Sequence, residues 1–399
     1  LHLTIIETIT INNHSYGIAP IWLAGENIYL GESALHVDNS VTLSSMNNGG
    51  DAGNRTRLRG FAGPCLTIRP RRRSENYGVR LQAKAAPTII QMKLRIFTEP
   101  QQGASYAQLL AVAQRAEQLG FDAFFRSDHF LKMGDVNGAP GPSDAWTTLA
   151  GISRETSKIR LGTLVNSVTF RHPAITAVSV ANVDAMSNGR VELGLGAGWY
   201  EAEHKAYGFR FPALGERFDM LGEQLHIING LWNTPLGETF CFDGSHYNVE
   251  NSPGLPKPVQ ARIPVIVGGR GAKKTPLLGA KYATEFNMPF VNSDLFMEQC
   301  VRVRDACASI GRDPKTLKYT IAQATVCGAN AAEVEQRTKK IGREVPELSA
   351  NGLCGTPAQI IAKIGEWKAA GAETIYMQIL DLDDLDHLDL IGKEVLPHI

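Results

Sequence analysis

The stretch FFRSDHF, at residues 124–130, places ionisable and hydroxyl side chains directly after an aromatic run. Because burying unpaired polar groups costs free energy, Ser127, Asp128 and His129 are expected to line a pocket at the end of a strand. A histidine whose tautomer is fixed by a neighbour can donate or accept a proton near pH 7. We therefore interpret His129 as a candidate acid/base, with Asp128 beside it. A histidine that only hydrogen-bonds the strand end is the alternative.

No metal site is predicted around this pair. The other histidines show no i, i+4 ligand spacing to His129, which a helical zinc site would need. The six cysteines include no CxxC pair, so neither a zinc knuckle nor a disulfide framework is expected. This cysteine usage is typical of a reducing compartment, and we expect a cytoplasmic protein.

Two glycine-rich stretches resemble known nucleotide-binding motifs. GLGAGW, at 194–199, has Trp199 where the dinucleotide fingerprint needs glycine or alanine, so a Rossmann site is excluded on steric grounds. In GGRGAKKT, at 268–275, Lys273 stands where a P-loop needs glycine. The second stretch still suits an anion, because backbone N–H groups at a helix start lie among basic and hydroxyl side chains. Those side chains are Arg270, Lys273, Lys274 and Thr275. An ordinary glycine turn is the alternative.

The elements that must position these motifs alternate regularly from Met92 onward. Ser105 and Gln108 form a capping box ahead of a helix that Gly120 ends. The predicted strands are 93–98, 123–126, 159–165, 190–196, 263–268, 283–287, 317–326 and 373–380. Strands that alternate with helices predict an α/β fold with a parallel sheet, and a closed (β/α)8 TIM barrel fits the length. A doubly wound open sheet is the alternative.

The connection between the fourth and fifth predicted strands is unusually long. It covers residues 197–262 and contains a predicted helix at 216–231. Connections of this length are usually functional lids or insertions. We therefore expect a barrel with an insertion after its fourth strand.

The overall composition limits the function classes. The chain has 399 residues, 43% of them hydrophobic, and a formal net charge of zero, which is typical of a globular protein with a large core. No stretch approaches the roughly 20 apolar residues of a membrane span. We expect a small-molecule substrate and neither a nucleic-acid nor a membrane partner; a homodimer is left open.

Charge is uneven near the N-terminus. Residues 54–91 carry eight Arg and one Lys against a single acidic residue. This basic block lacks apolar periodicity, which is typical of a disordered segment. We expect residues 1–91 to be a basic extension, disordered or wrongly included, ahead of a barrel at 92–399. A nucleic-acid-binding arm and an organelle transit peptide are the alternatives.

Together, the motifs in residues 92–399 resemble the bacterial luciferase-like superfamily. They are SDH after strand two, RLGTLVNSVTFRHP, RVELGLGAGWYEAEHKAYG, ERFDMLGEQLHII and VGGRGAKKT. Within that superfamily the chain is most similar to the branch that uses the deazaflavin coenzyme F420. The resemblance implies an F420-dependent oxidoreductase that transfers a hydride between the deazaflavin and an organic substrate. An FMN-dependent luciferase-like monooxygenase is the alternative, and a barrel that binds a flavin without catalysis is another.

The resemblance also implies roles by position. His129 matches the family's acid/base beside the deazaflavin. Leu164 and Val165 match a pair joined by a non-prolyl cis peptide under the cofactor ring. The remaining positions implied to bind the cofactor are Gly196, Ala197, Gly198 and Trp199 on strand four, and Gly268, Gly269, Arg270, Gly271, Lys273, Lys274 and Thr275 in the phosphate loop.

One position departs from the family pattern. The sugar-phosphate dehydrogenases of this family carry a glutamate after the strand-four glycine, where this chain has Trp199. Their substrate and catalytic acid are therefore not transferred to this chain. Trp199 favours an apolar or aromatic substrate, and Glu99, at the end of the first strand, is the candidate replacement carboxylate.

Overall fold

The computed structural model describes residues 92–399 throughout and, within residues 1–91, six short strands. Those strands are β1 (Ile21–Leu23), β2 (Glu26–Ile28), β3 (Ser40–Ser44), β4 (Arg55–Arg59), β5 (Cys65–Pro70) and β6 (Tyr77–Gln82). They pair in sequence order as three antiparallel ladders. The structure divides into two units, Leu1–Ile90 and Gln91–Ile399. The prediction for residues 1–91 falls mainly outside the described residues and stays a prediction.

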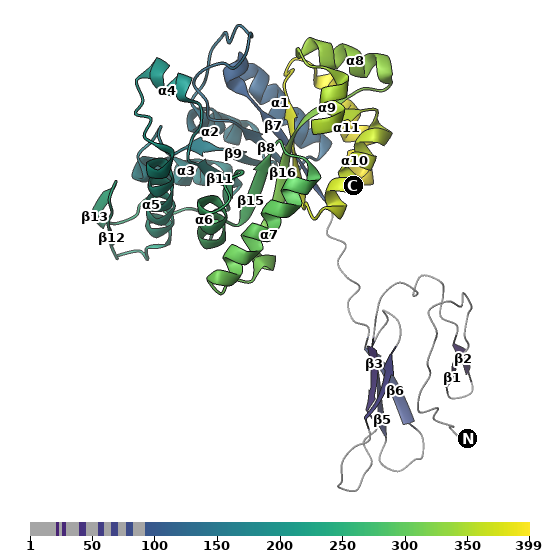
Figure 1. Ribbon diagram of the computed structural model, residues 1–399. Helices are drawn as coiled ribbons and strands as arrows, with labels where there is room; N and C mark the ends of the chain where they lie inside the picture. Colours follow the sequence, from purple (N-terminus) through teal and green to yellow (C-terminus); the bar gives the residue numbers. More distant parts are fainter. Residues whose placement is uncertain are drawn as a thin grey trace. The chain divides into compact units, whose positions relative to one another are not determined.

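Eight parallel strands of the second unit close into a barrel (Figure 1). They are β7 (Lys93–Thr98), β8 (Ala123–Arg126), β9 (Arg160–Thr163), β11 (Val191–Gly196), β14 (Val265–Gly268), β15 (Glu285–Pro289), β16 (Lys318–Cys327) and β18 (Thr374–Ile379). Pairing of β9 with β11 and of β18 with β7 completes the ring. The short strands β10 (Asn166–Ser167) and β17 (Leu353–Gly355) extend it at β11 and β16. The predicted (β/α)8 barrel is confirmed.

Helices follow the strands and surround the barrel (Figure 1). They are α1 (Tyr106–Leu119), α2 (Ala145–Glu155), α3 (Pro173–Ser187), α6 (Lys274–Tyr282), α7 (Ser293–Ser309), α8 (Ala331–Lys340), α9 (Val345–Asn351), α10 (Pro357–Ala369) and α11 (Leu385–Glu394). The insertion after β11 contains α4 (Glu201–Tyr207), α5 (Leu214–Asn233) and the hairpin of β12 (Phe240–Asp243) and β13 (Asn248–Ser252). None of the helices among the described residues is long and apolar enough to cross a membrane.

Local sequence signals explain several element ends. The Ser105 hydroxyl accepts the Gln108 N–H in the predicted capping box of α1, and Gly120 ends the helix at φ 87°, a conformation that favours glycine. The third strand is shorter than predicted. It ends at Thr163, the peptide bond between Leu164 and Val165 is cis, and β10 then resumes pairing with β11.

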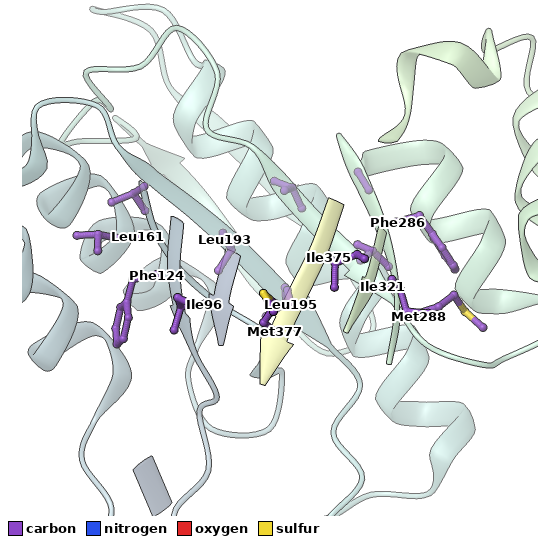
Figure 2. Close-up of a cluster of buried hydrophobic side chains, with 14 of the residues drawn as sticks. Ile96, Phe124, Leu161, Leu193, Leu195, Phe286, Met288, Ile321, Ile375 and Met377 are labelled. Atoms are coloured by element: carbon purple, nitrogen blue, oxygen red, sulfur yellow. The ribbon is translucent and has the colours of Figure 1, made fainter. Parts of the chain in front are cut away.

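Outward-facing side chains of the barrel strands form the main core. Figure 2 shows this cluster of buried hydrophobic side chains, including Ile96, Leu193 and Met377. Because side chains alternate along a strand, the neighbours of Ile96 on β7 point the other way, into the barrel. Burial of the large outward residues against the helices is the main favourable free energy of the fold.

The barrel interior is layered. Near the strand starts, the buried Arg95 guanidinium contacts Glu192 at 2.8 Å, Glu285 at 3.4 Å and the Tyr376 hydroxyl at 2.7 Å. Burial acts to raise the pKa of Glu192, but the positive charges of Arg95 and Arg160 outweigh it and lower that pKa. An apolar layer that includes Phe97 and Ile266 lies above these charges. Side chains therefore fill the barrel at the N-terminal ends of the strands, and a ligand site is expected at their C-terminal ends.

Candidate active site

His129 lies at the C-terminal mouth of the barrel, on the loop that follows β8. Its Nδ1 is 2.9 Å from Oε1 of Glu203, and Oε2 of Glu203 accepts the Phe130 N–H at 2.9 Å. Glu203 is on α4 and is only 1% exposed. Among the described residues, the second ring nitrogen, Nε2, has no hydrogen-bond partner. The neutral imidazole that donates Nδ1–H to the carboxylate therefore keeps the Nε2 lone pair for other groups.

Electrostatics tune His129 toward proton transfer. Burial lowers the pKa of the imidazole, but the hydrogen bond and charge of Glu203 and the charge of Glu99 outweigh it, so the pKa of His129 is raised above its ordinary value. The Asp128 charge acts in the same direction. The raised pKa favours the protonated imidazole, and an imidazole can both accept and donate a proton.

Glu99 lies at the end of β7 and is half-buried. Gln378 donates to its Oε1 at 2.8 Å, and Gln101 donates to its Oε2. Burial raises the pKa of Glu99; the charge of His129 and the two amide hydrogen bonds oppose this effect without cancelling it. The structure thus brings Glu99, predicted as a replacement carboxylate, close enough to His129 for their charges to interact.

Asp128 has different partners from those the sequence suggests. Its carboxylate is 1% exposed and forms an ion pair with Arg171 and a hydrogen bond with Asn166. Neither partner is His129, although the two residues are adjacent in sequence. The geometry gives Asp128 a part in fixing the loops after β8 and β9.

The end of β11 packs tightly against the segment that follows β9. A Cβ atom at Gly194 would lie 2.1 Å from the Thr163 carbonyl oxygen, and one at Gly196 would lie 2.9 Å from a Val165 methyl group. At Gly198, φ is 75°, where glycine is favoured. Backbone with few side-chain atoms therefore borders the Leu164–Val165 cis peptide, as the resemblance implies for this pair.

Trp199 and Tyr200 form an aromatic wall beside His129. Their rings stack with centroids 5.2 Å apart, and the His129 ring meets the Trp199 ring edge-on at 5.8 Å. Trp199 is 64% exposed, whereas the Tyr200 hydroxyl donates to the Lys132 carbonyl oxygen at 3.0 Å. An exposed indole fixed in this way offers an apolar face to a ligand.

The predicted phosphate loop lies between β14 and α6. Helix α6 begins without a side-chain cap, so its first backbone N–H groups are available to an anion. Two of the predicted cations are directed elsewhere. Arg270 donates to the Phe290 carbonyl oxygen at 2.5 Å, and Lys274 pairs with Asp219 at 2.5 Å. The backbone N–H groups of the loop are therefore better placed to bind an anion than its charged side chains, because residues outside the loop bind two of the three.

Sequence reasoning missed Glu203, which is the direct partner of His129. The two residues are 74 positions apart, and no local spacing links them. The signal available was the segment WYEAEH after strand four, in which Glu201 is exposed and Glu203 is buried in the structure. In that segment, Glu203 closely follows the aromatic residues Trp199 and Tyr200, and this was the only signal for it in the sequence.

Comparison with known proteins adds a family. A family model described as luciferase-like monooxygenase matches residues 89–346. A relative from Microbacterium testaceum named F420-dependent glucose-6-phosphate dehydrogenase is 36% identical over 175 residues. The match covers 43% of this chain and 49% of the relative, so the chain spans about half the relative's length.

Solved structures share the barrel. An F420-dependent secondary alcohol dehydrogenase in complex with an F420–acetone adduct matches with a TM-score of 0.66 and 20% identity. A monooxygenase from Streptomyces bottropensis matches with a TM-score of 0.65 and 19% identity. Each match covers 77% of this chain and 99% of the other. At these identities, the likeness shows a common fold.

Proposed function

The chain belongs to the luciferase-like monooxygenase family, and from that membership we propose that it is an oxidoreductase dependent on coenzyme F420. The observation that carries the proposal is the arrangement at the barrel mouth. A histidine held at Nδ1 lies beside a stretch of nearly bare backbone and an exposed tryptophan. The name of the relative from M. testaceum supports the deazaflavin over FMN.

The residues present fit such a cofactor. Gly196, Ala197 and Gly198 carry at most one methyl group, so a flat ring can approach the backbone beside Leu164–Val165. The uncapped start of α6, preceded by Gly268–Gly271, offers backbone N–H groups to a phosphate. Lys273 adds a positive charge there. Asp219 holds the Lys274 ammonium, so we assign that lysine only a minor share of the anion site.

When bound, the deazaflavin exchanges a hydride with a substrate carbon and scarcely activates oxygen, so the reaction is dehydrogenation or reduction. His129 handles the accompanying proton. Its Nε2 accepts the hydroxyl proton when an alcohol becomes a carbonyl, and returns it in the reverse direction. Glu99 assists His129 in this step, since the charge of its carboxylate favours the protonated imidazole.

The substrate we propose is an uncharged, apolar or aromatic alcohol or carbonyl compound. Trp199 presents its indole where the resemblance implies a glutamate in the sugar-phosphate dehydrogenases, and an apolar face contributes most by burying apolar surface. Glu99 and Glu203 next to His129 disfavour an anionic group at the reacting end, because like charges repel. A sugar phosphate is therefore a poor fit.

Turnover by the full-length chain tests this proposal. Oxidised F420 is mixed with a panel of neutral secondary alcohols and, separately, with glucose 6-phosphate, while the visible absorbance of the cofactor is followed. Bleaching with an apolar alcohol, but not with glucose 6-phosphate, is the expected result. Turnover of the sugar phosphate alone would overturn the substrate class. If reduced FMN and oxygen instead convert a compound of the same panel to an oxygenated product, the protein is a monooxygenase and the dehydrogenase assignment is wrong.

A further inference from the structure

Glu203 is a buried carboxylate that the sequence does not point to. Its two oxygens have separate partners, Nδ1 of His129 and the backbone N–H of Phe130, each at 2.9 Å. It therefore connects α4 of the insertion to the loop after β8 at two adjacent points. Because this carboxylate is 1% exposed and each of its oxygens has a hydrogen-bond partner, its side chain is held in one rotamer.

We propose that Glu203 is the positioning residue of the site, which fixes His129 as the Nδ1–H tautomer and directs Nε2 toward the barrel mouth. The inference rests on the proposed function of His129 as the acid/base. Because its second oxygen accepts the Phe130 N–H, the Glu203 carboxylate stays in place, and rotation of the His129 ring would break the hydrogen bond to Nδ1. Ring orientation and tautomer are thus set by one side chain.

Other groups around His129 do not fill this role. Glu99 faces it from the end of β7, but its two oxygens accept the amide hydrogen bonds of Gln378 and Gln101. Asp128 on the same loop is held by Arg171. The aromatic rings of Trp199 and Tyr200 meet the imidazole edge-on and supply no charge. Among the described residues, Glu203 alone bonds the imidazole directly.

Nuclear magnetic resonance of the histidine-labelled full-length chain tests the inference without cofactor or substrate. The His129 signal is assigned by its loss in His129→Asn. In the unsubstituted protein, the ¹⁵N shifts of neutral His129 should report the Nδ1–H tautomer; the Nε2–H tautomer would overturn the proposal. Apart from the assignment by His129→Asn, this first readout is made on the unsubstituted protein and does not depend on whether Glu203→Gln folds.

Glu203→Gln then removes the charge and keeps the shape. The pKa of His129 should fall by about 1–3 pH units, the range for loss of a close opposite charge. Glu201→Gln, on the exposed side of the same helix, is the matched control and should leave that pKa unchanged. An unaltered His129 pKa in Glu203→Gln, or equal shifts in both variants, would mean that Glu203 only packs α4.

Kinetics separate this inference from the proposed function. With a panel alcohol that is oxidised, the acid limb of the pH–rate profile in Glu203→Gln should move to lower pH by the same amount as the His129 pKa. The maximum rate should fall by up to about 100-fold, the cost of a misplaced catalytic group. If no F420 reaction is found but the resonance results hold, the proposed function fails and the positioning role of Glu203 stands.

Discussion

A methyl group added at Gly194 should damage both the barrel and the cofactor site. The added Cβ would lie 2.1 Å from the Thr163 carbonyl oxygen and 2.7 Å from a Val165 methyl group. The first obstacle is backbone, so β9 or β11 must shift at the seam where their pairing closes the barrel. Overpacking of this kind costs about 1–3 kcal/mol. We expect Gly194→Ala to lower the free energy of unfolding by that amount.

Urea unfolding of the full-length chain, followed by tryptophan fluorescence, measures the change. F420 binding should weaken in parallel, because the displaced segment includes Leu164–Val165. Gly365→Ala is the control: Gly365 lies within α10 with no atom within 4 Å of the added Cβ, so alanine should stabilise the helix by about 0.5–1 kcal/mol. A Gly194→Ala protein with unchanged stability and F420 affinity would refute the argument.

Three further predictions concern single side chains. His129→Asn should lower kcat for a panel alcohol by about 10²–10⁴ while the F420 dissociation constant changes little; equal loss of both would assign His129 to binding. Arg95→Met should lower the free energy of unfolding by about 3–5 kcal/mol, because it removes the only cation among the described residues that pairs with the buried Glu285 and leaves the buried Glu192 with Arg160 alone; urea titration gives the value, and a neutral effect would contradict it. Burial lowers the pKa of His387 to about 4 from an ordinary 6.5, so the unfolded chain binds the proton first. The His387 contribution to stability should therefore be fully present above pH 6.5 and decline between pH 6.5 and 4 by about 1.4 kcal/mol per pH unit. His387→Gln should flatten that slope, and an unchanged slope would show that other groups cause it.

The barrel could be predicted because its signals are local. The strands β7 and β8 match their predicted bounds, since aliphatic and aromatic residues are concentrated in each of these short segments. The third strand was predicted to reach Val165 but ends at Thr163. Apolar composition continues past the point where backbone pairing stops, so hydrophobicity alone could not locate that end.

The site was predicted only in part, because its pairings are tertiary. His129 stands out by its position after a strand, whereas its partner Glu203 comes from a helix 74 residues later. Lys274 reads as a phosphate ligand from its loop, but α5 supplies Asp219 to pair with it. The cis peptide at Leu164–Val165 followed from family resemblance and is present; no propensity of these two residues would have suggested it.

Cofactor selectivity tests the central claim most directly. The purified full-length chain is titrated with coenzyme F420 and with FMN, and binding is followed by fluorescence. We predict a micromolar or lower dissociation constant for F420 and binding of FMN at least tenfold weaker, a difference of about 1.4 kcal/mol. Tighter binding of FMN, with oxygen consumption by the reduced complex when substrate is added, would contradict the F420-dependent assignment.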